Sequence, residues 1–473
     1  MSWGWRWRVG CFLLCLPAPF AWTANAQSPS KQQLDQEYQA AVADYEAGRL
    51  PQAADELQRI LPYAPQNYEL RELLGMVYAS LAQTGRAVEQ LKVAVRIKPD
   101  LAAARVNLGV ALVHDGNRDA AADQFERAAL LDPGNYDAHH NLGELYVQGG
   151  RIAEAQPYLE KAWRIRPQAY DNAYDLAMAD YLLGRVDQAR QIVNALIKVR
   201  DTGELRSLLG QIDEKSRQYI AAANDYEAAV HLDPSEDNLF NWGSEMLLHR
   251  TYEPAIAIFQ QGVQRYPSSP RMWIGLGLAD YSRGKYDPAI KALLAAADLN
   301  PRDPRCYVFL SKAYNSSPLQ ADEVTQRFRR YAELEPENAL AQYYYAVSLW
   351  KGRRVEDPGT DLAAVESLLR KAIALNDSLA PAHVQLGDLY EDERNYGESI
   401  PQYERALQLD PSLTDAYYRL GTDYVHAGEK EKAQREFAVY QKLRAEHLAE
   451  VEKERAQVEQ FVYSEKGQTA SAP

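Results

Sequence analysis

The stretch NLGVALVHDGNRDAAADQFERAALLDPGN, from Asn107 to Asn135, is followed at Asn141 by the similar stretch NLGELYVQGGRIAEAQPYLEKAWRIRPQA. In each stretch, apolar residues at helical spacing are interrupted by a short turn with glycine, and a second such run ends before a proline. Proline cannot continue a helix and disfavours helical geometry in the residue before it. Each stretch therefore predicts two antiparallel helices joined by a short turn. A single pair leaves an apolar face uncovered, so the pairs must stack.

The period of 34 residues extends along most of the chain. Prolines recur at this spacing or within one residue of it, at positions 65, 99, 133 and 167 and again at 234, 267, 301 and 336. Small residues keep the same period, as in Gly109, Ala121 and Ala128. We expect these three residues to lie where the two helix backbones approach closely, with Phe125 as the large side chain beside them.

The repeated residues form a pattern that resembles the tetratricopeptide repeat family. It is clearest in two units, at Trp273, Leu276, Gly277, Ala289, Leu293, Ala296 and Pro301, and at Tyr417, Leu420, Gly421, Tyr424, Ala433 and Phe437. The resemblance implies an all-α fold, an α-solenoid in which about twelve helix pairs over residues 34–443 form a right-handed superhelix. It also implies that the first helices line a concave groove, which often holds a peptide or another protein.

Three units depart from the pattern. One has Asp201-Thr202-Gly203 in place of its proline, and another has a lengthened turn at Ser317-Pro318 with Lys312 in the place of the glycine. A third inserts the polar loop LWKGRRVEDPGTDLAA, which begins at Leu349. These breaks are interpreted either as hinges or docking loops or as neutral variation in turns.

The two ends of the chain differ from the repeats. Residues 1–26 carry Arg6 and Arg8, then an apolar stretch, then the small-residue sequence Ala24-Asn25-Ala26, an order typical of a secretory signal peptide. The sequence therefore predicts export to the periplasm or secretion, with residues 27–33 as a short linker. Residues 444–466 predict a charged capping helix, or alternatively a coiled-coil contact with a partner, and residues 467–473 a disordered tail.

Composition argues against several classes of function. The net charge of −14 becomes −16 if residues 1–26 are removed, and such an acidic protein repels nucleic acid and anionic membrane surfaces. The apolar stretch near the start is too short and too rich in proline for a stable membrane span. Without residues 1–26 only Cys306 remains, so no internal disulfide is possible.

Residue patterns of enzymes and metal sites are missing from the repeats. The chain after residue 26 has no GxxxxGK, HExxH, CxxC or GxSxG motif. His139 and His140 with Glu144 are the strongest metal candidate, but no third ligand is evident. We therefore expect a non-catalytic protein that uses no cofactor and no metal.

The resemblance also implies which side chains face the groove. Transferred to this chain, the inward-facing places are apolar and rich in tyrosine, which suits burial of a peptide segment. The alternative is that many of these residues pack between neighbouring units. The places are Tyr174, Met178, Tyr181, Phe240, Ile274, Leu278, Tyr281, Tyr343, Val347 and Trp350.

Two functions fit this sequence. The first is a scaffold that binds a protein or peptide partner in the groove, outside the cytoplasm. The second is a structural component of an envelope assembly for secretion, pilus formation or polysaccharide export, which would use the convex face and the C-terminal helix. Family members that grip a C-terminal carboxylate resemble one another in a lysine and an asparagine at two groove places, and no unit here has that lysine or that asparagine.

Overall fold

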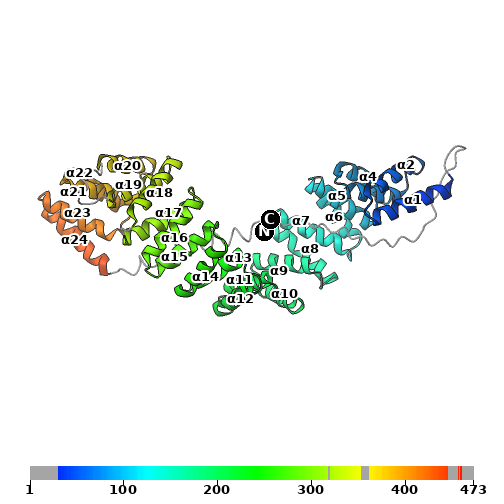
Figure 1. Ribbon diagram of the computed structural model, residues 1–473, viewed down its shortest axis with the longest axis horizontal. Helices are drawn as coiled ribbons and strands as arrows, with labels where there is room; N and C mark the ends of the chain where they lie inside the picture. The colour runs from blue at the N-terminus through cyan, green and yellow to red at the C-terminus, as the bar shows by residue number, and fades with distance from the viewer. Residues whose placement is uncertain (1–29, 318–319, 353–361, 446–455, 457–458, 461–473) are drawn as a thin grey trace. The chain divides into compact units, whose positions relative to one another are not determined.

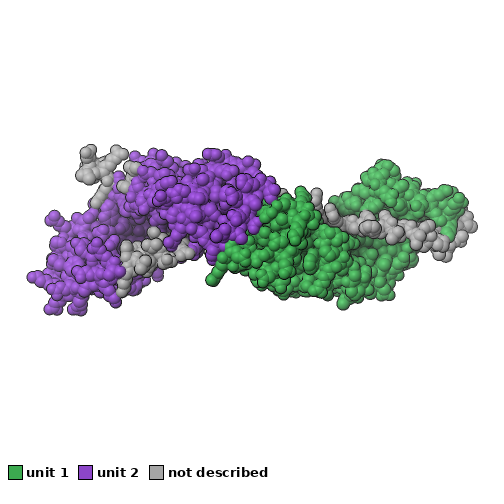
Figure 2. Space-filling view, turned by 90° about the horizontal axis from the view of Figure 1, so that it is seen from below, with its two compact units in different colours: residues 1–218, 473 green, residues 219–472 purple. Residues whose placement is uncertain are grey.

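The computed structural model describes residues 30–317, 320–352, 362–445, 456 and 459–460 of the chain. This described part holds twenty-four α-helices and one 3₁₀ turn (Leu61–Tyr63), and it forms two compact units that divide between α11 and α12 (Figures 1 and 2). The alternation of first and second helices confirms the prediction of about twelve helix pairs and of an all-α solenoid of stacked antiparallel pairs.

The first unit contains eleven of these helices. They are α1 (Lys31–Glu46), α2 (Leu50–Ile60), α3 (Tyr68–Ser80), α4 (Thr84–Ile97), α5 (Ala102–His114), α6 (Arg118–Leu131), α7 (Tyr136–Gln148), α8 (Ile152–Ile165), α9 (Tyr170–Leu182), α10 (Val186–Val199) and α11 (Gly203–Lys215). First helices contact the next first helix along the chain, α3 with α5, α5 with α7 and α7 with α9. They therefore form one continuous layer within this unit.

The second unit contains the remaining helices of the described part. They are α12 (Tyr219–Leu232), α13 (Glu236–Leu248), α14 (Tyr252–Arg265), α15 (Pro270–Ser282), α16 (Tyr286–Leu299), α17 (Pro304–Ser316), α18 (Ala321–Leu334), α19 (Ala339–Lys351), α20 (Leu362–Leu375), α21 (Ala380–Asp392), α22 (Tyr396–Leu409), α23 (Thr414–His426) and α24 (Lys430–Ala445). Here α13, α15, α17 and α19 contact one another in order.

The two helices of a pair approach most closely at a glycine of the first helix. A Cβ atom built on Gly109 would lie 2.4 Å from Cε1 of Phe125, and one built on Gly143 would lie 2.6 Å from Cδ2 of Leu159. Ala121 and Ala128 are fully buried on either side of Phe125. The prediction that these small residues mark a close approach of the two helices is confirmed, because a side chain at the glycine would overlap the large residue opposite.

Most first helices end in a residue with left-handed backbone geometry. Glycine takes this place in six turns, for example Gly116 with φ of +80° and Gly284 with φ of +83°. In other turns the place is held by a residue with a side chain, such as Ala82 (φ +56°) or Arg250 (φ +59°). A left-handed residue reverses the chain directly after the helix, and only glycine does so without a steric penalty.

A side chain near the start of many first helices fastens the preceding loop. Trp273 donates from Nε1 to the carbonyl oxygen of Pro267 at 2.9 Å, and Tyr307 donates from its hydroxyl to that of Pro301 at 3.0 Å. Tyr307 is thus the counterpart of Trp273. Gly277 lies four residues after Trp273, and Ser311 lies four residues after Tyr307. Ser311 is therefore the residue equivalent to the repeat glycine, and the prediction that Lys312 replaces this glycine is wrong by one residue.

The N-terminal boundary differs slightly from the prediction. Helix α1 begins at Lys31, because Ser30 and Gln33 form a capping box in which the amide of Gln33 donates to Oγ of Ser30 at 3.3 Å. Residues 31–33 are therefore helical and do not belong to a linker. The predicted signal peptide at 1–26, most of the predicted capping helix at 444–466 and the predicted tail at 467–473 lie outside the described residues.

Among the helices of the described ranges, none is both long enough and apolar enough to cross a membrane.

Candidate functional site

The predicted groove residues all lie on first helices, but four of them are buried. Their side chains belong to the interior of the second unit, where for example Phe240 packs edge-on against Phe259 with ring centroids 6.0 Å apart. A side chain enclosed by neighbouring helices cannot contact a partner, so these four places are removed from the candidate surface. The four are Phe240 on α13, Ile274 and Leu278 on α15, and Val347 on α19.

The other predicted places in the second unit are half-buried and engaged with neighbouring aromatic rings. Tyr281 on α15 lies 5.7 Å, centroid to centroid, from Tyr286. Tyr343 on α19 lies 5.6 Å from Tyr344, and burial raises its pKa well above the ordinary value. Trp350 packs against the core formed by α19, α20 and α21. These side chains pack against their neighbours within the second unit and are only partly accessible.

Helix α9 in the first unit carries the remaining three places. Tyr174, Met178 and Tyr181 are half-buried, and they pack against the core of this unit with part of each side chain accessible. The ring of Tyr174 stacks on that of Tyr170, with centroids 6.3 Å apart and an interplanar angle of 12°. We call Tyr174, Met178 and Tyr181 the α9 wall.

Contacts from α11 hold the α9 wall in place. The hydroxyl of Tyr174 donates a hydrogen bond to the carboxylate of Glu204. The ammonium of Lys215 donates to the carbonyl oxygen of Tyr181 at 2.7 Å and lies 4.6 Å from the centroid of its ring. The bond to Glu204 and the contact of Lys215 with the Tyr181 ring restrain two aromatic side chains before any partner arrives, which lowers the entropy cost of binding.

Four carboxylates on α7, α9 and α11 interact with one another, and the sequence pattern did not identify them as a set. Glu144 on α7, Asp171 and Asp175 on α9, and Glu204 on α11 act electrostatically on one another. Asp171 and Asp175 are four residues apart, which places them on one helix face. That spacing was the signal available in the sequence. We call Glu144, Asp171, Asp175 and Glu204 the acidic cluster.

Asp175 is the most enclosed member of the acidic cluster. Only 9% of the residue is exposed, and the charged side chains that act on its carboxyl group are the acidic Glu144, Asp171 and Glu204. Burial and the neighbouring carboxylates raise its pKa to about 8, and burial raises the pKa of Glu144 to about 7. Both groups would gain from a cation placed beside them.

The histidine pair that the sequence suggested as a metal candidate does not converge on one point. Nε2 of His139 lies 3.1 Å from the carbonyl oxygen of Pro133, whereas Nδ1 of His140 lies 3.3 Å from Oδ1 of Asn172. Nε2 of His140 is 3.9 Å from the nearer oxygen of Glu144. No group of three His, Cys, Asp or Glu side chains suited to a metal ion occurs among the residues that the structure describes.

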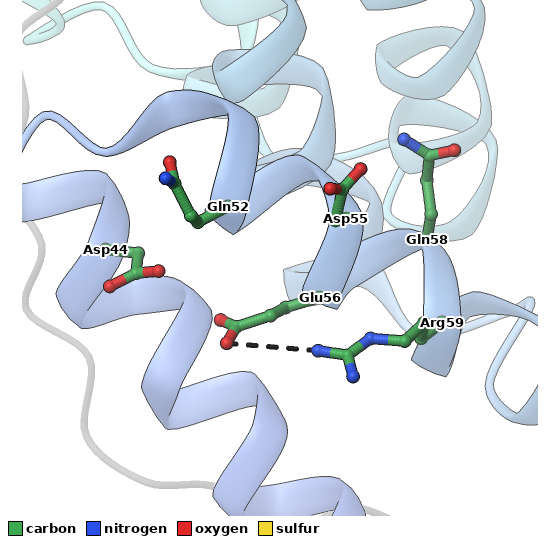
Figure 3. A pocket seen from close by; sticks show the side chains of 6 residues that line it. All are labelled: Asp44, Gln52, Asp55, Glu56, Gln58 and Arg59. Atoms are coloured by element: carbon green, nitrogen blue, oxygen red, sulfur yellow. Dashed lines mark ion pairs between the residues drawn. The ribbon is translucent and has the colours of Figure 1, made fainter.

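A separate hollow lies between α1 and α2 (Figure 3). It is open and polar, and Arg59 lies 3.9 Å from Glu56, one turn earlier on the same helix. Asp44 at its edge is paired with Arg49 at 2.6 Å. Oε2 of Glu56 is buried without a hydrogen-bond partner among the described residues, and burial raises the pKa of this carboxyl group. The lining residues are Asp44, Gln52, Asp55, Glu56, Gln58 and Arg59.

Comparison with known sequences identifies the repeat. Tetratricopeptide repeat families match residues 38–102, 112–157, 149–212, 248–304 and 380–413, which together cover somewhat more than half of the chain. Curated relatives include the TPR repeat-containing protein YpiA of Bacillus subtilis, 25% identical over 39% of this chain and 42% of that protein. Protein O-mannosyl-transferase TMTC3 of Mus musculus is 21% identical over 38% of this chain and 21% of its own length. The chain spans less than half of either relative.

Solved structures match this chain at low sequence identity and low TM-score. The complex of Naa15 and Naa10 bound to HypK-THB matches 86% of this chain and 68% of that chain, with 17% identity and a TM-score of 0.39. MamA matches 36% of this chain and 95% of its own, with 22% identity and a TM-score of 0.29.

Proposed function

Since the chain belongs to the tetratricopeptide repeat proteins, we propose that it is a non-catalytic scaffold that holds a protein or peptide partner against the first helices of its first unit. Tetratricopeptide repeats are typically non-catalytic. The observation that carries the proposal is the α9 wall, where Tyr174, Met178 and Tyr181 remain partly accessible while residues of α11 contact Tyr174 and Tyr181. Rigid aromatic side chains with an accessible face are common anchors of protein interfaces.

We also propose that the protein acts outside the cytoplasm, in the periplasm or after secretion. The support is the order of basic, apolar and small residues in positions 1–26. Cleavage after Ala26 would leave Cys306 as the only cysteine. This thiol is buried, and burial raises its pKa above the ordinary range, so it would stay protonated and unreactive in an oxidising compartment.

Matched truncations test the proposed binding face. The tagged full chain is crosslinked in cells as wild type, as Tyr174→Ala with Met178→Ala, and as Leu130→Ala with Val199→Ala. The last pair is the control, since Leu130 and Val199 are 80% and 86% exposed on second helices and their truncation leaves the core intact. We expect the partner to be lost only from the first pair. A partner retained there at the wild-type level would contradict the proposal.

The same experiment addresses the second candidate, a structural component of an envelope assembly that uses the outer face. The observation in its favour is the exposure of Leu130 and Val199, two apolar side chains near the ends of second helices. In that case the partner would be lost from the Leu130→Ala, Val199→Ala variant and kept by the other. Neither pair of substitutions changes the net charge, so the result is independent of electrostatics.

A further inference from the structure

We infer that the helix pair α23 and α24 is a pH-sensitive element, which packs firmly on α22 in mildly acidic solution and opens more often at neutral pH, with Asp423 as the group that responds. This pair ends the run of helices in the described part of the second unit (Figure 1). The inference is independent of the proposed binding face, because that face belongs to the first unit.

The carboxyl group of Asp423 is enclosed between α23 and α22. The residue is 0% exposed, and the hydroxyl of Ser399 on α22, also fully buried, donates a hydrogen bond to its Oδ2. Among the residues that the structure describes, Oδ1 of Asp423 has no hydrogen-bond partner. Burial with one oxygen unpaired penalises the ionised carboxylate much more than the neutral acid, so the packed pair favours a protonated Asp423.

The repeat pattern is altered on both sides of this contact. Ser399 lies twelve residues after Gly387, the place that Ala121 takes after Gly109. A serine thus replaces the repeat alanine where the next first helix brings in a carboxyl group. At the place equivalent to Asp423 on α13, the buried Glu245 lies 3.2 Å from the imidazole of His249. The buried acid of α13 therefore has an ionisable neighbour on its own helix, whereas Asp423 is bonded to a hydroxyl group that cannot supply a counter-charge.

Charged groups of two helices act on Asp423 with opposite effects. Burial raises its pKa most, and Glu391 on α21 raises it further, whereas His426 and Arg419 on α23 and the hydroxyl of Ser399 lower it. From α24, the uncharged Ala433 belongs to the same small core. Burial outweighs the two cationic side chains, and the pKa of Asp423 is raised from 3.8 to about 6.

The position of Asp423 lets one proton affect the whole helix pair. Helix α23 packs on α22, and α24 packs on α23. A small core joins the three helices, and pairs at the end of a repeat array open locally because they have a neighbour on one side only. The loss of stability at the contact of α22 with α23 therefore acts on α23 and α24 together. The buried residues of this core are Tyr403, Leu407, Ala416, Leu420, Tyr424 and Ala433.

The direction of the pH effect follows from the raised pKa. At a pH between 3.8 and about 6, Asp423 is protonated in the packed pair and ionised once the pair opens. The packed state has the full benefit of this group below that window and loses it as the pH rises through the window. The opening equilibrium of α23 and α24 should therefore grow about tenfold between pH 5 and pH 7.

Hydrogen–deuterium exchange of the purified full chain, followed by mass spectrometry at pH 5 and pH 7, measures this opening. Each exchange rate is divided by the intrinsic rate of the same amides at that pH. Helices α17 and α18 are the internal reference, because their buried Asp303 is ion-paired with Arg305 at 2.7 Å. The chain is compared as wild type, as Asp423→Asn and as Asp415→Asn, and the last variant removes an exposed carboxylate from the same helix.

We expect the opening of α23 and α24, relative to the reference, to increase about tenfold from pH 5 to pH 7 in wild type and Asp415→Asn, and by less than about twofold in Asp423→Asn. An equal increase in Asp423→Asn, or a wild type that opens equally at both values, would overturn the inference. If Asp423→Asn does not fold, Ser399→Ala replaces it. Loss of the hydroxyl that stabilises the ionised carboxylate should then make the increase larger than in wild type, and an increase that is equal or smaller would overturn the inference.

Discussion

Replacing Asp175 by asparagine should stabilise the protein at neutral pH and leave it no more stable in acid. The pKa of Asp175 is raised from 3.8 to about 8 by burial and by neighbouring carboxylates. At a pH between these two pKa values, Asp175 is protonated in the folded chain and ionised in the unfolded chain. Stability therefore falls as the pH rises through this window, and asparagine, which carries no proton to release, removes the dependence.

The magnitude follows from the size of the pKa shift. One unit of pKa difference corresponds to about 1.4 kcal/mol, so this one group lowers the free energy of unfolding by about 3 kcal/mol between pH 5 and pH 7. An amide buried without a partner costs about 1 kcal/mol at every pH. The net expectation for Asp175→Asn is a gain of about 3 kcal/mol at pH 7, and a loss of about 1 kcal/mol below pH 4.

Urea unfolding of the full chain, followed by far-ultraviolet circular dichroism at pH 4, 5, 6 and 7, measures this difference. Asp187→Asn is the control, because its exposed side chain should change stability by less than about 1 kcal/mol at all four values. A difference between Asp175→Asn and wild type that stays constant from pH 4 to pH 7 would refute the reasoning. It would mean that Asp175 ionises in the folded protein as it does in the unfolded chain.

Three further predictions concern the repeat itself, and each is read from thermal or urea unfolding of the full chain. Gly116→Ala should lower the free energy of unfolding by about 1 kcal/mol, because the left-handed backbone of this turn disfavours a side chain even though no atom lies near it. Ala82→Gly should raise the free energy of unfolding by about 0.5–1 kcal/mol, because glycine adopts the same backbone geometry without that penalty. Changes of the opposite sign would show that these turns are not strained. Phe125→Ala should lose about 3–5 kcal/mol, and Gly109→Ala should recover part of that loss in the double variant, since the two groups compete for one space. Trp273→Phe should lose about 1 kcal/mol with its hydrogen bond, and an unchanged midpoint would make that bond unimportant.

The repeat was predictable from sequence because its causes are local. Proline at the end of each pair and glycine at the close approach act within 34 residues, so the spacing alone places Gly109 opposite Phe125. The N-terminal boundary was missed by three residues because the capping box of Ser30 and Gln33 extends α1 beyond its apolar pattern. A hydrogen-bonded helix cap is harder to recognise in a sequence than the apolar periodicity of a buried helix face.

The candidate site was predictable only in part. The 34-residue period predicts which residues lie on a first helix. How far each of their side chains is exposed depends on the side chains that the neighbouring helices pack against it. Leu278 and Met178 occupy equivalent places in their repeats, yet Leu278 is buried and Met178 is half-exposed. The acidic cluster could not be seen as a unit, since Glu144, Asp175 and Glu204 come from three helices and meet only after the repeats stack.

The claim that a partner lies against the α9 wall is tested most directly by placing the photocrosslinking residue benzoylphenylalanine at Met178 and, separately, at Leu130 of the full chain in cells. Met178 is half-exposed on the first-helix layer, whereas Leu130 is 80% exposed on a second helix. The account predicts that light produces one discrete crosslinked partner from position 178 and none from position 130. A partner crosslinked from position 130 and absent from position 178 would contradict it.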